Sequence, residues 1–234
     1  MDKRVFLFAG AGISAESGVP TFRDSNGLWS TFNVQQFCDQ FTFLKNKNNS
    51  FYRKNLMEFY TNLKTEIEKT APNEAHLKAA KWQKELGPSN VQIWTSNIDD
   101  LFERAGCESV KHVHGDLSKM ECCACGKSWK VASFEDSRCM FCNSRLTKPA
   151  VVFFNQKAPL YPSLFSAFHP KKRKKEDVFL FAGCSQEVIA PTRLFKDNKK
   201  GTFILVNTRE HEEDWFFSKR LYGPATEGFK EIDF

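Results

Sequence analysis

No stretch of this 234-residue sequence stays apolar over the roughly 20 residues that a membrane-spanning helix requires. Little sequence precedes the first apolar run, which begins at Val5, so we expect no signal or transit peptide. The eight cysteines are not spread as a disulfide framework, because four of them form two close Cys-x-x-Cys pairs. These absences predict a cytoplasmic protein that does not bind membranes, with a nuclear location open only if the source is eukaryotic.

The composition permits a full hydrophobic core. Hydrophobic residues make up 41% of the chain and charged residues 26%, which suits one large domain with an insert. The 24 phenylalanines are interpreted as core-filling residues. A net charge of +6 does not identify a partner by itself. Its concentrated part, the Lys-Lys-Arg-Lys-Lys run at 171–175, is either a nucleic-acid or nuclear-import patch or, more simply, an exposed helix end or loop. Nucleic acid is therefore an unfavoured but open partner.

A glycine-rich turn follows the first apolar run. Val5–Ala9 is predicted to be a buried strand, and Gly10, Gly12 and Ala15 after it spell Gly-x-Gly-x-x-Ala. Such a turn from strand into helix can hold a pyrophosphate with backbone N–H groups and the helix dipole. A simple dehydrogenase has a second strand and an acidic residue about 20 positions later. Here a loop over residues 18–29 takes that place, which indicates a different kind of dinucleotide site.

The apolar runs of strand length predict the fold class. They are near-continuous instead of alternating, as in strands covered on both faces, and occur at Val5–Ala9, Val91–Thr95, Val151–Phe154, Val178–Ala182 and Thr202–Val206. We expect an α/β fold with a doubly wound parallel sheet. The hexapeptide Val-Phe-Leu-Phe-Ala-Gly occurs at 5–10 and again at 178–183. We interpret the pair as two parallel strands that each end in a glycine turn, not as a duplication.

Helical patterns separate the strands. They cover Asn73–Leu86 before Gly87, Ile98–Ala105 before Gly106, and the amphipathic segment Phe51–Ile67. We expect one domain over residues 1–234. Its large Rossmann-type lobe comprises residues 1–30, 71–115 and 150–234, with a helical insert at 31–70 and a second insert of a different kind at 116–149.

The second insert contains two metal-binding knuckles. Cys122 and Cys125 form one Cys-x-x-Cys pair, and Cys139 and Cys142 form the other. Four thiolates can hold a tetrahedral Zn²⁺ and leave no open position on it, so the spacing predicts one structural zinc ion. Cys123 offers an alternative Cys-x-Cys register that fits the knuckle less well.

Polar residues follow one central strand and predict the chemistry of the site. Asn97 and Asp99 come directly after Val91–Thr95, at the carboxyl edge of the sheet where ligands bind. An amide and a carboxylate at this position can hydrogen-bond to a carboxamide such as that of nicotinamide. His114 stands next to Gly115, and a neutral imidazole is the preferred general base for a hydroxyl near pH 7. A lone loop histidine does not establish catalysis by itself.

Taken together, the motifs resemble those of one family, the sirtuins. They occur in the family's order, with the four-cysteine module between the histidine motif and the last third of the chain: Gly10–Ser14, Gly18–Arg23, Asn97–Asp99, His114-Gly115, Val151–Phe154, Gly183–Ser185, Asn207…Glu210 and Tyr222–Ala225. The resemblance covers essentially the whole chain and is closest to compact bacterial members. It implies an NAD-dependent protein lysine deacylase, or deacetylase, that transfers the acyl group of acyl-lysine to ADP-ribose and releases nicotinamide.

The resemblance also implies residue roles. His114 would be the general base, and Asn97 and Asp99 would act with it in the nicotinamide pocket. Further contacts to NAD fall on Gly10, Ala11, Gly12, Ile13, Phe22, Arg23, Ser96, Ile98, Gly183, Cys184, Ser185, Asn207, Glu210 and Ala225. The acyl-lysine would meet Val152, Phe153 and Phe154, together with Tyr60 and Leu63 on the segment Phe51–Ile67. Tyr60 and Leu63 have core packing as their alternative.

Some positions depart from the family pattern. Ser96 stands where a glutamine is usual, Asn155-Gln156 where Gly-Glu is usual, and Cys184 where a threonine is usual. A side chain at Asn155 would crowd a peptide that docks as a strand. Weak deacylation is therefore an alternative outcome, and an ADP-ribosyltransferase or NAD hydrolase that uses the same pocket is the alternative function. A non-catalytic NAD- or nucleic-acid-binding module is a third, which the retained Asn97, Asp99 and His114 disfavour.

Overall fold

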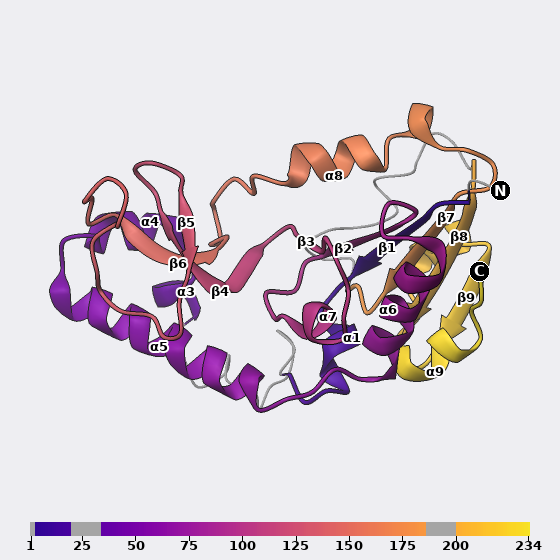
Figure 1. Ribbon diagram of the computed structural model, residues 1–234, viewed down its shortest axis with the longest axis horizontal. Coiled ribbons are helices and arrows are strands. Elements are labelled where there is room, and N and C mark those ends of the chain that lie inside the picture. Colours follow the sequence, from indigo (N-terminus) through magenta and orange to yellow (C-terminus); the bar gives the residue numbers. More distant parts are fainter. Residues whose placement is uncertain (1–2, 20–33, 186–199) are drawn as a thin grey trace.

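The larger lobe is built on one six-stranded parallel sheet (Figure 1). The computed structural model describes residues 3–19, 34–185 and 200–234. Within them the strand order is β3-β2-β1-β7-β8-β9. The strands are β1 (Val5–Ala9), β2 (Val91–Thr95), β3 (Lys111–His112), β7 (Val178–Ala182), β8 (Thr202–Asn207) and β9 (Lys219–Tyr222). The chain leaves β1 toward β2 and β3 on one side and returns to β7, β8 and β9 on the other. The sheet is therefore doubly wound, with its switch point between β1 and β7.

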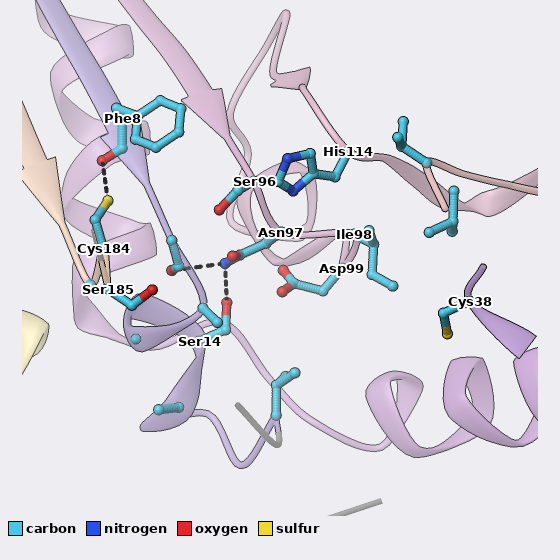
Figure 2. A pocket seen from close by; sticks show the side chains of 18 of the residues that line it. Phe8, Ser14, Cys38, Ser96, Asn97, Ile98, Asp99, His114, Cys184 and Ser185 are labelled. Carbon is cyan, nitrogen blue, oxygen red and sulfur yellow. Dashed lines mark hydrogen bonds between the residues drawn. The ribbon is translucent and has the colours of Figure 1, made fainter. Parts of the chain in front are cut away.

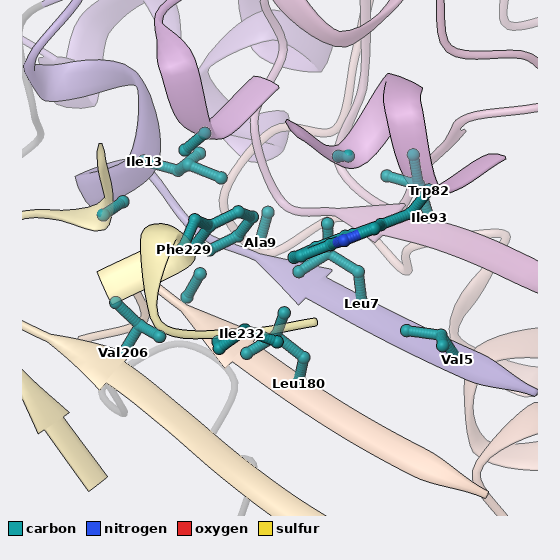
Figure 3. Close-up of a cluster of buried hydrophobic side chains, with 14 of the residues drawn as sticks. Val5, Leu7, Ala9, Ile13, Trp82, Ile93, Leu180, Val206, Phe229 and Ile232 are labelled. Carbon is teal, nitrogen blue, oxygen red and sulfur yellow. The ribbon is translucent and has the colours of Figure 1, made fainter. Parts of the chain in front are cut away.

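Helices cover both faces of this sheet. On one face, α1 (Gly12–Ala15), α6 (Glu74–Leu86), α7 (Leu101–Arg104) and α9 (Ala225–Lys230) contribute buried side chains to a common aliphatic core (Figure 3). On the other, α8 (Tyr161–Ala167) and the 3₁₀ helix η3 (Glu212–Phe216) pack on an aromatic core. A second 3₁₀ helix, η1 (Pro170–Lys172), follows α8. None of the described helices has the length and apolar character needed to cross a membrane.

Phenylalanines fill the second face of the sheet, as their number suggested. The ring of Phe6 stacks on that of Phe179 at 5.0 Å between centroids, and Phe179 stacks on Phe203 at 5.1 Å. The repeated hexapeptide explains this regularity, because β1 and β7 pair in parallel and each residue faces its own copy, from Val5 opposite Val178 to Ala9 opposite Ala182. The interpretation as two parallel strands that each end in a glycine turn is confirmed, and the structure shows in addition that the two strands are neighbours.

The smaller lobe combines a three-stranded antiparallel sheet with helices of the 31–70 region (Figure 1). The sheet contains β4 (Gly115–Cys122), β5 (Ser128–Lys130) and β6 (Thr147–Val151), in the order β5-β4-β6. The helices are α3 (Val34–Phe37), α4 (Gln40–Asn46) and α5 (Ser50–Glu68). Phe59, Leu63 and Ile67 recur every four residues on α5 and are all buried in the lobe's core, which confirms the amphipathic pattern.

Two predicted elements need correction, and two strands of the central sheet were missed. The run Val151–Phe154 is not a strand of the central sheet, because β6 ends at Val151 and pairs with β4 in the small sheet. Its remaining residues leave the sheet, so their apolar side chains serve another purpose. The helix predicted from Ile98 begins only at Leu101. Strands β3 and β9 were not predicted, because β3 has two residues and β9 alternates between half-buried and exposed positions.

The basic run at 171–175 is not a uniformly exposed segment. Arg173, its central residue, is 5% exposed and donates from Nε and Nη2 to the carbonyl of Phe168 at 3.0 and 2.9 Å. Its guanidinium lies over the rings of Phe179 and Phe203. Burial lowers the pKa of Arg173 to about 10. The expectation of a simple exposed loop is therefore wrong for this residue, which closes the aromatic core.

Two glycine turns cross at the switch point. A Cβ added at Gly10 would lie 2.5 Å from the carbonyl oxygen of Gly183, and one added at Gly12 would lie 2.7 Å from the Gly183 Cα. Gly183 itself has a φ of +61°, and its own Cβ would lie 2.4 Å from the backbone nitrogen of Ile13. The turns after β1 and β7 can therefore touch only because the residues at the contact are glycines, which have no side chain.

Gly183→Ala should lower the free energy of unfolding by roughly 1–3 kcal/mol, because the backbone of the facing turn must move. Gly106→Ala is the matched control, since Gly106 also has a positive φ, of +98°, but nothing lies within 4 Å of its added Cβ. Urea denaturation of both variants measures the difference. Equal losses of stability would show that backbone strain alone matters and that the crossing does not.

Candidate active site

A large cavity opens where the two lobes meet, at the carboxyl ends of β1, β2 and β7 (Figure 2). Its volume is about 750 Å³, within the roughly 300–1,000 Å³ of typical small-molecule sites. The large lobe supplies mostly backbone and polar groups to its wall, and the small lobe supplies mostly apolar side chains. The switch point of a doubly wound sheet is where such a site is expected.

Most of the residues predicted from the sequence line this cavity. Those implied for NAD are Gly10, Ala11, Gly12, Ser96, Asn97, Ile98, Asp99, Gly183, Cys184, Ser185 and Asn207, and the predicted general base His114 lies with them. Those implied for the acyl-lysine are Tyr60, Leu63, Val152, Phe153 and Phe154. Residues from seven separate segments thus line one cavity.

Three predicted residues are placed differently, and two are not among the described residues. Ile13 is fully buried in the aliphatic core, so its side chain does not reach the cavity. Ala225 is buried in the same core, while its neighbour Pro224 borders the cavity. Glu210 is exposed in an adjoining hollow, and its contact with NAD stays a prediction. Phe22 and Arg23 lie outside the described residues.

The glycine turn after β1 uses its backbone donors within the protein. Gly10 N–H donates to the Ala182 carbonyl at 2.9 Å, and Gly12 N–H donates to the Gly183 carbonyl at 3.1 Å. The N–H groups of Ile13 and Ser14 donate back into the turn itself. These four N–H groups are therefore hydrogen-bonded within the protein, and the binding of a pyrophosphate by this turn stays a prediction. The glycines also allow the close crossing of the two turns.

Asn97, Ser14 and Asp99 form a buried polar group at the bottom of the cavity (Figure 2). Asn97 Nδ2 donates to the Gly10 carbonyl at 3.2 Å and to Ser14 Oγ at 3.0 Å. The Ser14 hydroxyl in turn hydrogen-bonds to the Asp99 carboxylate. Both amide donors of Asn97 are thus used, and its oxygen is the atom that it can offer to a ligand N–H. The sequence places Ser14 in the motif Gly10–Ser14 but does not predict its hydrogen bonds to Asn97 and Asp99, which only the structure shows.

Burial raises the pKa of Asp99, against the hydrogen bonds from the Leu101 N–H and the Ser14 hydroxyl. His112 lies behind this group, with Nδ1 2.8 Å from the Asn97 carbonyl and Nε2 2.9 Å from Glu103 Oε1. Burial alone would lower the pKa of His112, but the Glu103 carboxylate outweighs it and the pKa is raised. His112 is a supporting residue that the sequence reasoning missed, although it stands two positions before His114.

His114 lies on the cavity wall with both sides of its ring engaged. Nε2 is 2.8 Å from the hydroxyl oxygen of Tyr161, and the ring hydrogen-bonds to the Ser96 carbonyl. Burial lowers the pKa of His114 below 6.5, although the Ser96 carbonyl opposes the shift. The imidazole is therefore neutral at pH 7 and can accept a proton. No spacing in the sequence linked Tyr161 to this histidine.

Cys184 and Asn207 brace the turn after β7. Burial raises the pKa of the Cys184 thiol to about 12, so it stays protonated and donates to the carbonyls of Phe8 and Ala182. Asn207 donates from Nδ2 to the Cys184 carbonyl at 3.0 Å, and its oxygen accepts from the Thr208 N–H. The neighbouring Arg209 and His211 also line the cavity and were not predicted as site residues.

The small lobe forms an apolar wall on the other side. Tyr60 is 1% exposed, and its hydroxyl donates to Cys38 Sγ at 3.2 Å and contacts the Phe37 carbonyl at 3.3 Å. Its ring stacks on Phe153 at 6.0 Å. Tyr60 and Leu63 are thus core residues that also border the cavity, so the core interpretation is confirmed and their contact with an acyl chain stays a prediction.

The four predicted cysteines come together in the small lobe. The sulfur atoms of Cys122, Cys125, Cys139 and Cys142 all lie within 4.8 Å of one another. Two of the separations, Cys122 to Cys142 and Cys125 to Cys139, are 3.6 and 3.7 Å. A tetrahedral zinc ion with Zn–S bonds of about 2.3 Å requires sulfur atoms about 3.8 Å apart. The set fits a structural zinc ion, and Cys123 is outside it, which confirms the chosen register.

Comparison with known proteins identifies the family. The family model described as the Sir2 family matches residues 10–190. An NAD-dependent protein deacylase of Campylobacter jejuni is 34% identical over 189 residues, which cover 80% of this chain and 76% of that protein. One of Helicobacter hepaticus is 32% identical over 254 residues, covering 98% and 96%. The crystal structure of a Sir2 homolog–NAD complex superposes with a TM-score of 0.77 at 30% identity, covering 98% of this chain and 87% of that one.

The chain therefore belongs to the Sir2 family, the sirtuins. The resemblance seen in the motifs is confirmed, and so is the α/β fold of Rossmann type with a four-cysteine, zinc-binding lobe.

Cys139→Ala should release the zinc ion and destabilise the small lobe, because losing a ligand removes the folding free energy that metal binding supplies. Activity should then fall indirectly. Cys123→Ala is the matched control, since this exposed cysteine lies outside the group of four and its variant should keep the metal. Metal analysis and thermal unfolding check both. A wild-type protein with well under one zinc per folded chain would contradict the assignment.

Proposed function

We propose that this protein is an NAD-dependent protein lysine deacylase that transfers the acyl group of acyl-lysine to ADP-ribose and releases nicotinamide. One observation carries the proposal. A single cavity places the buried group Asn97–Ser14–Asp99 and the neutral His114 against an apolar wall from the small lobe. The deacylases and the NAD complex to which the chain is similar support the same activity.

The residues divide the reaction between them. The Asn97 oxygen and the Asp99 carboxylate are suited to the carboxamide of nicotinamide, whose N–H groups need acceptors. His114 accepts the proton of a ribose hydroxyl once nicotinamide has left. Val152 N–H already donates to the His114 carbonyl at 2.8 Å, so the Val152 carbonyl is the backbone group that would meet the acyl-lysine amide. The acyl chain would occupy the space beside Tyr60, Leu63 and Phe153.

NAD hydrolysis or ADP-ribosyl transfer in the same pocket is the second candidate, and one feature favours it. Phe154 N–H donates to the Cys38 carbonyl at 2.6 Å, and the Phe154 carbonyl accepts from Gln40 N–H at 3.0 Å. Asn155 has a left-handed φ of 62° and donates to Asp39 at 2.6 Å. This edge is therefore already paired where an extended substrate peptide would add as a strand.

Product analysis by mass spectrometry after incubation with NAD and an acetyl-lysine peptide separates the candidates. O-acyl-ADP-ribose indicates deacylation, free ADP-ribose indicates hydrolysis, and a mass gain on protein indicates transfer.

The proposed partner is an acylated protein. Arg173 is buried and only the four lysines of the basic run are exposed, so nucleic acid stays an unfavoured but open partner, and a cytoplasmic location stays a prediction.

His114→Ala should lower turnover by roughly 10²–10⁴-fold, because it removes the general base, while NAD affinity is kept. In the wild-type protein, turnover should be flat above pH 6.5 and fall below it, since burial holds the pKa of His114 under that value and only the neutral ring accepts a proton. Rates over a pH series and NAD titration calorimetry test both points. An active His114→Ala enzyme would place the base elsewhere.

Acetyl and longer apolar acyl groups should be preferred over succinyl. The α5 residues on the cavity wall are Tyr60, Leu63 and Ile67, none of which is charged. Of the α5 cations, Arg53 pairs with Asp136, Lys64 pairs with Glu68 and Lys54 is exposed, and none of them borders the cavity. At the α5 wall that the structure describes, a succinyl carboxylate would thus be buried without a cation from this helix.

Leu63→Arg should shift the succinyl-to-acetyl ratio toward succinyl, because a guanidinium can pair with a carboxylate through two hydrogen bonds. Leu63→Met, which keeps an apolar side chain of similar size, should leave the ratio unchanged. Competition assays with matched acetyl and succinyl peptides measure it. Efficient desuccinylation by the unmodified protein would refute the assignment of this wall.

A further inference from the structure

The base of the proposed reaction does not present a vacant nitrogen to the cavity. His114 Nε2 is 2.8 Å from Tyr161 Oη, and the ring is also hydrogen-bonded to the Ser96 carbonyl. A neutral imidazole has one N–H and one lone pair. If the N–H donates to the Ser96 carbonyl, Nε2 carries the lone pair and Tyr161 must be its donor. This arrangement satisfies every group in the chain Tyr161–His114–Ser96.

Tyr161 is held in place at the start of α8. Its N–H donates to the Ala158 carbonyl, and its ring packs against His114 and against Phe165, each at 5.9 Å between centroids. The side chain borders the same cavity as His114. Among residues 3–19, 34–185 and 200–234, His114 is the side chain with which the Tyr161 hydroxyl forms its hydrogen bond. The hydroxyl oxygen therefore keeps lone pairs for a ligand in the cavity.

We propose that Tyr161 carries the proton from the substrate hydroxyl to His114. The substrate O–H bond breaks as a new O–H bond forms at Tyr161 Oη, and the proton originally on Tyr161 passes to His114 Nε2. Tyr161 ends neutral, His114 ends as imidazolium, and the freed electron pair on the substrate oxygen forms the bond to the acyl carbon. This inference rests on the proposed function, in which a ribose hydroxyl is the group deprotonated.

The Tyr161 hydroxyl could relay the proton or merely cover His114 Nε2, and the two roles predict different turnover once the hydroxyl is removed. Without the phenol, a relay leaves the substrate hydroxyl one hydrogen-bond length short of Nε2. If the Tyr161 hydroxyl only blocked His114 Nε2 and had to move aside for the substrate, its removal would make Nε2 more accessible. Turnover would then stay the same or rise. The two roles predict opposite changes in rate.

Tyr161→Phe in the full chain tests the relay, with NAD and an acetyl-lysine peptide as substrates. Turnover should fall by roughly 10²-fold, the scale of a lost proton-transfer group, while NAD affinity is unchanged. Combination with His114→Ala should cause no further loss, because both residues serve one proton path. When the rate is measured at increasing fractions of heavy water, the wild-type dependence should require two protons that move in the transition state. The variant should not show this dependence.

Tyr222→Phe is the matched control, since its hydroxyl contacts Asp214 outside the cavity wall and its loss should leave turnover within about twofold. Thermal unfolding verifies that each variant is folded. Turnover of Tyr161→Phe at or above the wild-type rate overturns the relay alone, because the wild-type protein is then shown to be active. A wild-type protein that forms no acylated ADP-ribose overturns the proposed function, and the relay with it.

Discussion

The contact between two glycine turns is the constraint on which the site depends. Gly10 and Gly12 after β1 pass so close to Gly183 after β7 that a Cβ on any of them would meet backbone atoms at 2.4–2.7 Å. Backbone hydrogen bonds from Gly10 to Ala182 and from Gly12 to Gly183 fix the crossing. Because β1 and β7 lie on either side of the switch point, the crossing sets the floor from which Ser14, Asn97 and Cys184 border the cavity.

The polar side of the cavity is held rigid by buried hydrogen bonds. Asn97 is tied to Gly10 and Ser14, and its carbonyl is bound by His112, which Glu103 in turn holds. Breaking one of these hydrogen bonds would leave a buried polar group unpaired, which costs free energy. Each hydrogen bond therefore restricts the movement of the residues that it joins. The Asn97 oxygen is therefore fixed in position before a ligand arrives.

The two lobes contribute opposite chemistry to the same space. The large lobe supplies backbone edges and polar side chains, while the small lobe supplies Tyr60, Leu63 and Phe153 from elements held by an aromatic core and by the four-cysteine cluster. The pairing of Asp39 with Phe154 and Asn155 ties the helical region 31–70 to the segment that follows β6. A change in the small lobe's metal site therefore reaches the reaction through packing and not through contact with the reacting atoms.

Local patterns determined much of this protein. Continuous apolar runs gave four of the six strands of the central sheet, the glycines marked both turns, and Cys-x-x-Cys spacing named the metal ligands, because each depends on neighbours along the chain. Tertiary structure alone decided the rest. Val152–Phe154 became cavity wall instead of strand, Arg173 was buried by Phe179 and Phe203, and Tyr161 reached His114 from 47 positions away. Such pairings are fixed by how the elements pack, and no periodicity of a single segment encodes them.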